Sequence, residues 1–495
     1  MPLPQDPYDA FTYPAFPFPN THPDRLAVMA TLHGLTSAPV ERCRVLEIAC
    51  NEGANLIPMA YAMPQSQFIG FDLAQAPVAR AQERIAALGL TNIRIFAGDL
   101  LDVGSELGQF DYIIAHGLYS WVPEPVRDRL LSLCSELLQP QGVAFISYNA
   151  LPGGHIRRML REMMQFRVED IEDPAQREAE ATRFLHLVAS TRPENDVYRV
   201  LLESQLQRID SRQPNVTFHD ELNSTYDTLS FFNFVKHAQK HGLQYLDDAE
   251  LPPPPDPSYR QDLRPMIESA AGNDFLRQEQ VLDFFRMRQY RETLLCKANV
   301  TVNREFAPEQ FRKLLFASQA AGTKNEETGA PVFQLPGGIK MESNHPVVIA
   351  LLTALERVWP RALSFDELVQ PLSESGFVLD TAGAGLLMRL AISKMIELRK
   401  WRAPLAEGIS ERPRASLCSR FEGRSRPQST TLLHLSIKLD DPKIKAFLQF
   451  ADGTRTRSEL LNAMVAEFPG TPVSQLEEGI EPTLRMFYAA GVLEA

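Results

Sequence analysis

The segment Arg44-Val-Leu-Glu-Ile-Ala-Cys-Asn-Glu-Gly53 indicates how this chain begins to fold. Its first half is a short apolar run that ends in small residues, which is typical of a buried strand in a parallel sheet. Its second half predicts a tight strand-to-helix turn, in which the backbone approaches a ligand closely and residues adopt positive φ. Gly53 is the true glycine of this turn, whereas Ala49 is merely small and Asn51 tolerates the left-handed region.

The same strand-helix alternation continues through the first third of the chain. A parallel sheet follows from it, because such connections cross over with one hand, and ligands then bind at the carboxyl ends of the strands. The further predicted strands are Gln67–Asp72, Asn92–Ala97, Phe110–Ala115 and Gly142–Ser147, and the predicted helices are an amphipathic Pro23–Leu35, one from about Ala54, Pro77–Leu88 and Val126–Leu138.

Asp72 ends the second predicted strand, about 20 residues past the turn, where a carboxylate accepts hydrogen bonds from both ribose hydroxyls. A pyrophosphate would need more glycines in the turn, so a compact nucleoside ligand is favoured over a dinucleotide. Two plainer interpretations stay open. The small residues could simply turn the chain, and Asp72 could cap the next helix.

Four groups of residues carry a family resemblance: Glu47 to Asn55, Asp72, Gly98-Asp99-Leu100 and Asp111 to Gly117. In this order they resemble the class I S-adenosylmethionine-dependent methyltransferases. The longer strings EIACNEGANLIPMAYAMP, HGLYSWVP, YNALPGGH, HDELNSTYDTLSFFNFVKHAQKHGLQYLDDAEL and EQVLDFFRMRQYRETLLC are similar to bacterial methyltransferases that carry a methyltransferase regulatory domain. Rickettsial outer-membrane-protein lysine methyltransferases belong to that group.

The resemblance implies S-adenosylmethionine as cofactor and S-adenosylhomocysteine as product. It implies that the turn residues line the methionine part, Asp72 binds ribose, Asp99 and Leu100 hold adenine, and His116 lies against the methionine end. The first two glycines of the usual G-x-G-x-G are missing here. The full predicted cofactor-binding set is Glu47, Ala49, Asn51, Gly53, Asn55, Asp72, Leu73, Asp99, Leu100 and His116.

Aromatic residues follow the fourth predicted strand, at the ligand-binding edge. We predict Tyr119 and Trp121 as walls of a substrate channel, with His116 positioning the reactants. For a lysine acceptor, neutralising the ammonium at pH 7 costs roughly 4–5 kcal/mol, which a desolvated channel reduces. The alternative is that both aromatic residues anchor the following helix in the core. A general base at His116 or His155 is the weaker interpretation.

The predicted fold class is α/β, a Rossmann-like class I methyltransferase domain with helix-rich C-terminal domains. The resemblance implies an antiparallel pair, His241–Asp248 and Tyr290–Cys296, that completes the sheet. The predicted divisions are 1–303 for the methyltransferase domain, with a helical insertion at about 156–215, then 304–430 for a middle domain and 431–495 for a small helical domain. A homodimer contact and a lid are the alternatives for the insertion.

The middle domain is predicted to be winged-helix-like, with helices Pro346–Val358, Ser364–Ser373 and Gly383–Lys400. Cations on the third helix could face phosphates, but such cations usually form a solvated face. The formal charge of −12 also repels a polyphosphate backbone, so nucleic acid is not the expected partner.

No metal is expected, because the five cysteines are scattered and His219-Asp220-Glu221 has no second histidine at ligand spacing. We expect reduced thiols, a cytoplasmic location and no membrane span. The proline-rich N-terminus predicts an extended strap over the domain or a flexible tail.

The C-terminal bulk favours a macromolecular acceptor, so a protein substrate is predicted. The alternatives are a small-molecule N- or O-methyltransferase and, because of the missing glycines, a non-catalytic cofactor-sensing protein.

Overall fold

The computed structural model describes residues 13–14, 16–212, 215–252 and 262–495. Its centre is a seven-stranded sheet with the strand order β3-β2-β1-β4-β5-β7-β6. The first five strands pair in parallel, and β7 lies antiparallel between β5 and β6. The predicted parallel sheet closed by an antiparallel pair is therefore confirmed. The strands are β1 (Arg44–Ile48), β2 (Gln67–Asp72), β3 (Ile93–Ala97), β4 (Phe110–Ala115), β5 (Leu138–Asn149), β6 (Leu243–Asp248) and β7 (Tyr290–Lys297).

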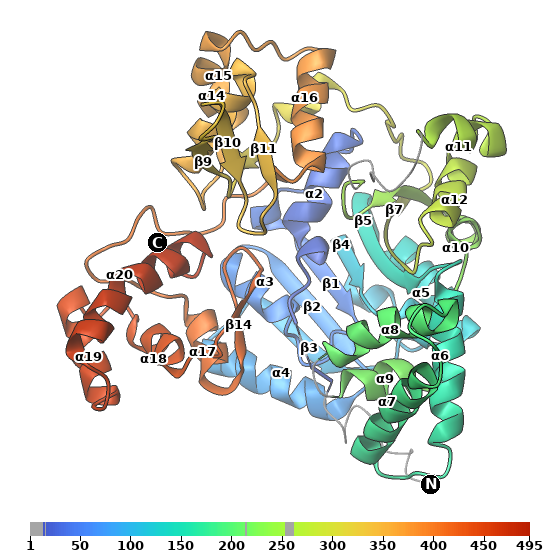
Figure 1. Cartoon of the computed structure of the whole chain (residues 1–495). Helices are drawn as coiled ribbons and strands as arrows, with labels where there is room; N and C mark the ends of the chain where they lie inside the picture. The colour runs from blue at the N-terminus through green and yellow to red at the C-terminus, as the bar shows by residue number, and fades with distance from the viewer. Residues whose placement is uncertain (1–12, 15, 213–214, 253–261) are drawn as a thin grey trace.

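Helices cover both faces of this sheet, because its strands are apolar on both sides (Figure 1). In β1, Val45 packs into the cluster with α2 and α3, whereas Leu46 packs into the cluster with α5 and α10 on the opposite face. Two further helices, α11 and α12, precede β7. The helices are α2 (Pro23–Leu32), α3 (Leu56–Ala62), α4 (Gln75–Leu88), α5 (Glu124–Leu137), α10 (Phe231–Lys240), α11 (Arg264–Ala271) and α12 (Phe275–Phe285).

The sequence predicts an amphipathic helix here, with one face exposed to solvent. In the structure every residue of α2 from Leu26 to Leu32 is buried, so this part of the helix has no exposed face. The reason is tertiary: α13 and β13 of the middle region pack on it from outside. An apparently exposed face is therefore an interface.

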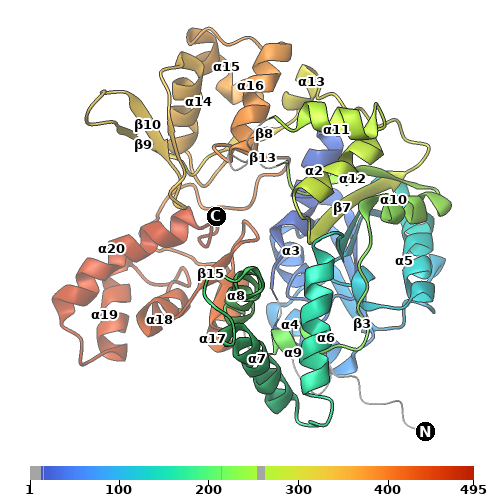
Figure 2. The same ribbon diagram turned by 45° about the vertical axis from the view of Figure 1, so that its right-hand side comes forward.

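The insertion follows β5 as four helices that share a hydrophobic cluster around Leu160, Leu185 and Leu202. They stand beside the carboxyl edge of the sheet (Figure 2). The helices are α6 (Gly154–Arg167), α7 (Pro174–Ser190), α8 (Val197–Asp210) and α9 (Val216–Glu221).

The middle region contains two three-stranded sheets and four helices. One sheet has the order β12-β8-β13 and the other β11-β10-β9. The strands are β8 (Leu315–Ala317), β9 (Ala321–Lys324), β10 (Pro331–Gln334), β11 (Lys340–Glu342), β12 (Leu363–Ser364) and β13 (Glu397–Arg399). The helices are α13 (Pro308–Phe311), α14 (Pro346–Glu356), α15 (Phe365–Glu374) and α16 (Thr381–Ile392).

The third helix predicted for this region ends at Ile392 rather than at Lys400. Lys394 adopts a φ of +62°, and Glu397–Arg399 then forms β13, which pairs with β8. Arg399 is buried and bound to Glu397, so it does not share a helix face with Arg389. The predicted row of helix cations therefore does not exist.

The end of the chain folds around a hydrophobic cluster that includes residues as early as Ala406 and Ala415. A hairpin of β14 (Gln428–Thr430) and β15 (Ser436–Lys438) crosses the predicted division at 430. We propose to place this division near residue 404 instead. The helices are α17 (Leu417–Ser425), α18 (Pro442–Phe450), α19 (Arg457–Glu467) and α20 (Val473–Ala489).

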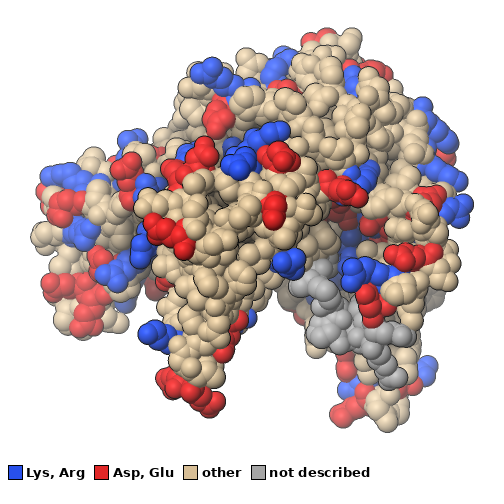
Figure 3. Space-filling model, turned by 90° about the horizontal axis from the view of Figure 1, so that it is seen from above, with Lys and Arg blue, Asp and Glu red and all other residues tan. Residues whose placement is uncertain are grey.

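Among the described residues, no helix is both long and apolar enough to cross a membrane. Positive and negative side chains are interspersed on the face shown in Figure 3. The first 12 residues of the predicted N-terminal strap lie outside the described residues, as does most of the proline run at 252–257.

Candidate active site

A cavity of about 680 Å³ opens at the carboxyl edge of the sheet, where β1, β2, β4 and β5 end. Such a volume is within the usual range of roughly 300–1,000 Å³ for small-molecule sites. The cavity brings together most of the site residues predicted from the sequence. Those that line it are Glu47, Ala49, Asn51, Asn55, Asp72, Leu73, His116 and Trp121.

The turn after β1 has the strained conformation that its sequence predicts. Ala49, Asn51 and Gly53 all have positive φ, at +59°, +49° and +67°. Gly53 does not line the cavity. It faces the core instead, where a Cβ at this position would lie 2.6 Å from the Ile95 side chain. Its absent side chain thus allows close packing behind the turn, while Ala49 and Asn51 line the cavity.

Asp72 organises this turn as well as lining the cavity. Its Oδ2 accepts a hydrogen bond from the Asn51 amide at 2.7 Å, and its Oδ1 accepts one from the Ala74 amide at 3.0 Å. The Asp72 carboxylate is therefore oriented by two backbone donors, which fixes its position at the end of β2.

Glu47 is a buried carboxyl group that lines the cavity, and it forms no ion pair with any residue that the structure describes. Its Oε1 accepts a hydrogen bond from Asn55 Nδ2 at 2.8 Å, and its Oε2 has no hydrogen-bond partner among the described residues. Burial raises the pKa of Glu47 to about 8. A buried carboxyl group of this kind is suited to a positively charged ligand group.

His116 follows β4 and is held between aromatic rings. Phe18 stacks on its imidazole with ring centroids 3.7 Å apart, and the Tyr290 hydroxyl lies 3.2 Å from its Nε2. Burial lowers the pKa of His116 to about 4, so the ring is neutral at pH 7. A neutral ring with this pKa is a weak base, and the geometry favours a positioning role.

The opposite end of the cavity is a charged cluster that the sequence analysis missed. The Arg157 guanidinium donates to Asn149, Asp220 and Glu221, and Arg212 donates to Glu221 at 2.8 Å. Burial alone would raise the pKa of Glu221, but attraction to both arginines outweighs it and lowers the pKa to about 2.

Trp121 joins this charged cluster to the predicted substrate channel. Arg157 lies over its indole with Cζ 5.0 Å from the ring centroid, and Arg161 lies over it at 5.4 Å. Arg157 stands two residues after the string YNALPGGH, so that string could have pointed to it. No local signal links Arg157 with Glu221, because they are 64 residues apart.

The N-terminal strap lies across the cavity. Its described residues are Tyr13, Pro14 and those from Phe16 onward. This arrangement agrees with the first of the two predictions for the segment, an extended strap over the domain. Tyr13, Pro14, Phe16 and Phe18 line the cavity. The Phe18 amide donates to Asn55 at 2.9 Å, and the Tyr13 hydroxyl lies 3.4 Å from Asp220. The strap thus connects the turn after β1 with the charged cluster.

Three other predicted residues lie away from the cavity wall. Tyr119 is fully buried in the core beneath α10, and its hydroxyl lies 2.7 Å from His237 Nδ1. Tyr119 is therefore a core aromatic residue, as the alternative interpretation predicted, and it does not line the cavity. Asp99 caps the turn after β3 by accepting from the Leu101 amide at 2.9 Å, and Leu100 is buried. Neither lines the cavity, so adenine contacts there stay a prediction.

The C-terminal region supports the cofactor turn from behind. Arg426 pairs with Glu52 of the turn, and Glu422 pairs with Arg84 of α4 at 2.7 Å. Nε2 of the buried His434 lies 2.8 Å from the side-chain oxygen Oδ1 of Asn55. Residues near both ends of the chain thus determine how the turn is held.

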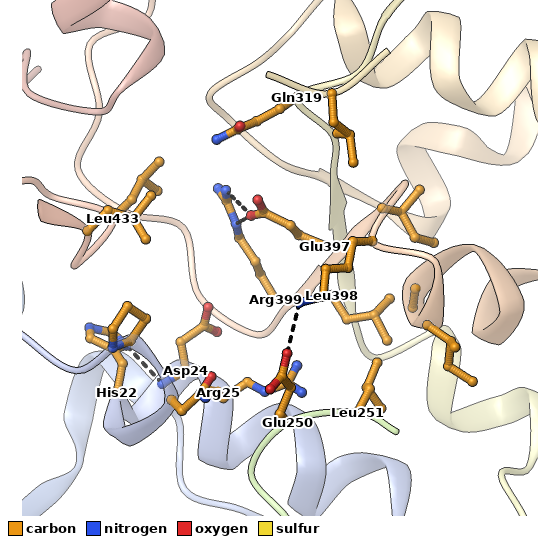
Figure 4. Close-up of a pocket in the computed structure, with 18 of the residues that line it drawn as sticks. His22, Asp24, Arg25, Glu250, Leu251, Gln319, Glu397, Leu398, Arg399 and Leu433 are labelled. Carbon is orange, nitrogen blue, oxygen red and sulfur yellow. Dashed lines mark hydrogen bonds and ion pairs between the residues drawn. The ribbon is translucent and has the colours of Figure 1, made fainter. Parts of the chain in front are cut away.

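A second cavity, of about 460 Å³, lies between α2 and the middle region. Figure 4 shows His22, Asp24, Arg25 and Glu250 on one side of it, facing Glu397 and Arg399 on the other. The strap separates the two cavities, because Phe18 lines the first and Pro19 and His22 line the second.

Two family models match the chain. A "Methyltransferase domain" model matches residues 45–142, and a "Predicted methyltransferase regulatory domain" model matches residues 213–297. The fold and the site define a class I S-adenosylmethionine-dependent methyltransferase.

Relatives narrow this assignment. The chain is 34% identical over 244 residues to the protein RP028 of Rickettsia prowazekii, which covers 48% of this chain and 96% of RP028. It is 33% identical over 311 residues to RP789 of the same organism, covering 62% of this chain and 56% of RP789, so the match spans about half of that relative. The chain belongs to the bacterial methyltransferases that carry the methyltransferase regulatory domain.

A solved structure shares nearly the whole fold. PKMT2 from Rickettsia typhi, in complex with AdoHcy, superposes with a TM-score of 0.85 at 23% identity and covers 97% of this chain and 99% of PKMT2. The helix-rich C-terminal region is thus part of a shared architecture.

The cofactor of this class is S-adenosylmethionine. The residues at the β1 end of the cavity fit it, since the Glu47 Oε2 atom lacks a partner among the described residues and Asp72 is oriented toward the same space. The Glu47 carboxylate can pair with the cationic methionine part of the cofactor, and the Asp72 carboxylate can accept hydrogen bonds from the ribose hydroxyls.

Proposed function

We propose that this chain transfers a methyl group from S-adenosylmethionine to a protein, with a lysine side chain as acceptor. The observation that carries the proposal is the chemical difference between the two ends of the cavity. Its β1 end presents the carboxyl groups of Glu47 and Asp72, whereas its far end is aromatic and rich in arginine.

The β1 end would bind the cofactor. Glu47 would pair with the ammonium group of the methionine part, and Asp72 would accept the ribose hydroxyls. Bound there, S-adenosylmethionine supplies an electrophilic methyl group on a sulfonium. The task left to the protein is to align an acceptor in line with that methyl group and to exclude water.

The arginine end favours a neutral amine. The arginines Arg157, Arg161 and Arg212 lie around the carboxylates of Asp220 and Glu221, so positive charges outnumber negative ones beside Trp121. A positive charge lowers the pKa of a nearby lysine, as does burial, and both reduce the roughly 4–5 kcal/mol that deprotonation costs at pH 7.

A protein acceptor fits the surroundings of the site. A second cavity lies on the other side of the strap, and residues of the middle and C-terminal regions line it, which offers a larger acceptor further contact surface. The similarity to the PKMT2 fold agrees with this proposal.

The test is transfer of labelled methyl groups from S-adenosylmethionine to a bacterial lysate. We expect labelled protein bands whose tryptic peptides carry methyl-lysine, and we expect Asp72→Ala to weaken them strongly when S-adenosylmethionine is limiting. Asp102→Ala is the matched control, because this acid is exposed near the same edge and does not line the cavity. A label found in a solvent-extractable product would replace the protein acceptor by a small molecule. Binding without turnover would indicate a cofactor sensor.

A further inference from the structure

Three metal-ligating side chains converge between α5 and α10, away from the cofactor cavity. His237 lies in the last turn of α10, His241 is the C-cap residue directly after that helix, and Asp128 belongs to α5. The Nε2 atoms of the two histidines lie 3.1 Å and 2.9 Å from the same oxygen of Asp128. The three donor atoms all lie within 4.8 Å of one another.

The histidine spacing is that of a helical metal site. Residues four apart on a helix face the same way, so His237 and His241 present their rings together, as paired histidines do in many zinc sites. Tetrahedral zinc, with ligands at about 2.0–2.2 Å, separates neighbouring ligand atoms by about 3.3 Å. The observed separations from Asp128 are within a few tenths of an ångström of this value.

An outer partner orients one of the two histidines. The buried Tyr119 hydroxyl lies 2.7 Å from His237 Nδ1, the ring nitrogen that points away from Asp128. Metal-bound histidines almost always use their second nitrogen in this way, which fixes the ring and its tautomer. The Asp128 side chain is 58% exposed, so the site is open to solvent and to an incoming ion.

We infer that Asp128, His237 and His241 bind a zinc ion. Two nitrogens and one carboxylate oxygen supply three ligands, and water supplies the fourth. The ion takes over the role of the protons that otherwise join the two imidazoles to the carboxylate. It is a clamp between the methyltransferase core and α10, which lies within residues matched by the regulatory-domain model.

One short turn connects the proposed zinc site with the active site. Tyr119 begins the 3-10 turn Tyr119–Trp121, and both Leu118 and Trp121 line the cofactor cavity. Fixing Tyr119 against His237 therefore fixes the backbone that carries the acceptor-side Trp121. The expectation of no metal was based on the cysteines and on His219, and it overlooked this pair.

The experiment is zinc binding by the full, untagged chain after chelator treatment, followed by calorimetry with zinc chloride and by cobalt substitution. We expect one ion per chain, a rise in Tm, and cobalt absorption typical of tetrahedral coordination. His241→Ala and Asp128→Asn should abolish this binding, and Asp128→Asn keeps the shape of the side chain. Tyr119→Phe should weaken it by about 10–100-fold, the usual effect of losing an outer partner.

His186→Ala is the matched control, since His186 pairs with Asp210 at 3.2 Å and has no second histidine in its cluster among the described residues. It should leave zinc binding unchanged. The inference is overturned if the wild-type chain takes up no stoichiometric zinc, or if binding survives both His241→Ala and Asp128→Asn. Because zinc binding is measured without cofactor, its outcome is independent of the proposed methyl transfer.

Discussion

Glu47 lines the cavity and Glu221 belongs to the charged cluster at its far end, and these two buried carboxyl groups have opposite environments. Glu221 is clamped by Arg157 and Arg212, and its pKa falls to about 2. Within the described part of the chain, Glu47 has the amide of Asn55 as a neighbour but no cation, and its pKa rises to about 8. A satisfied buried charge holds the scaffold together, whereas an unsatisfied one marks a place where a ligand completes the site.

Removing Glu221 should have the largest effect on stability. Glu221→Ala removes the more deeply buried of the two carboxylates that Arg157 and Arg212 share and leaves them with Asp220. Breaking a buried ion pair typically costs about 3–5 kcal/mol. We expect a large fall in the free energy of unfolding, measured by urea denaturation of the full chain. Glu203→Ala is the control, because its ion pair with Arg199 in the same insertion is only partly buried. Equal stability of both variants would show that Glu221 is not a structural charge.

Removing Asp72 should act on binding. Asp72→Ala loses charged hydrogen bonds to the ribose, and the expected loss of cofactor affinity is about 2 kcal/mol. Calorimetry with S-adenosylhomocysteine measures this loss, and Asp102→Ala should not show it. Unchanged affinity in Asp72→Ala would place the ribose elsewhere in the cavity.

The unsatisfied Glu47 should make cofactor binding pH-dependent. Its pKa of about 8 means that the unliganded group is protonated at pH 6–7, and pairing with a cation requires it to release that proton. Affinity should therefore rise with pH in this range, by at most about 1.4 kcal/mol per pH unit. Calorimetry in buffers of different ionisation enthalpy should detect proton release. Glu47→Gln should abolish it, whereas Glu83→Gln, at an exposed position of α4, should not.

The same group affects stability in the opposite direction when no ligand is bound. The folded-state pKa of Glu47 lies above its ordinary value of 4.5, so its stabilising contribution is complete below pH 4.5 and is lost as pH rises toward 8. Cofactor should restore this loss. A Tm difference between wild type and Glu47→Gln that did not change with pH would contradict the raised pKa.

The two ends of the cavity also differ in how far the sequence predicts them. The β1 end could be predicted, because an apolar run, three turn positions and Asp72 are local signals on consecutive strands. The arginine end could not, because Arg157, Arg212 and Glu221 meet only once α6 and α9 pack together.

Two further predictions, the position of Tyr119 and the end of helix α16, were wrong because long-range packing decides both. Tyr119 and Trp121 are two residues apart on a 3-10 turn, and only the packing of α10 directs Tyr119 into the core while Trp121 lines the cavity. Likewise, α16 ends at Ile392 because β13 pairs with β8, which lies about 80 residues earlier. Long-range pairing ended this helix without a local signal.

The smallest expected effect concerns backbone strain at the β1 end. Ala49 has a φ of +59°, which costs an L-residue roughly 1–2 kcal/mol, whereas glycine avoids this cost but loses about 0.5–1 kcal/mol through unfolded-state entropy. Ala49→Gly should therefore raise the free energy of unfolding by up to about 1 kcal/mol, measured by urea denaturation.

Ala79→Gly, at an exposed position inside α4, has the opposite expected sign, because glycine disfavours a helix interior by about 1 kcal/mol. The contrast separates backbone strain from a general effect of glycine. If Ala49→Gly also lowered stability, the turn would not store strain at this position. If it raised stability yet weakened S-adenosylhomocysteine binding, the alanine methyl group would be part of the binding surface, and the departure from the usual glycine would serve the ligand rather than the fold.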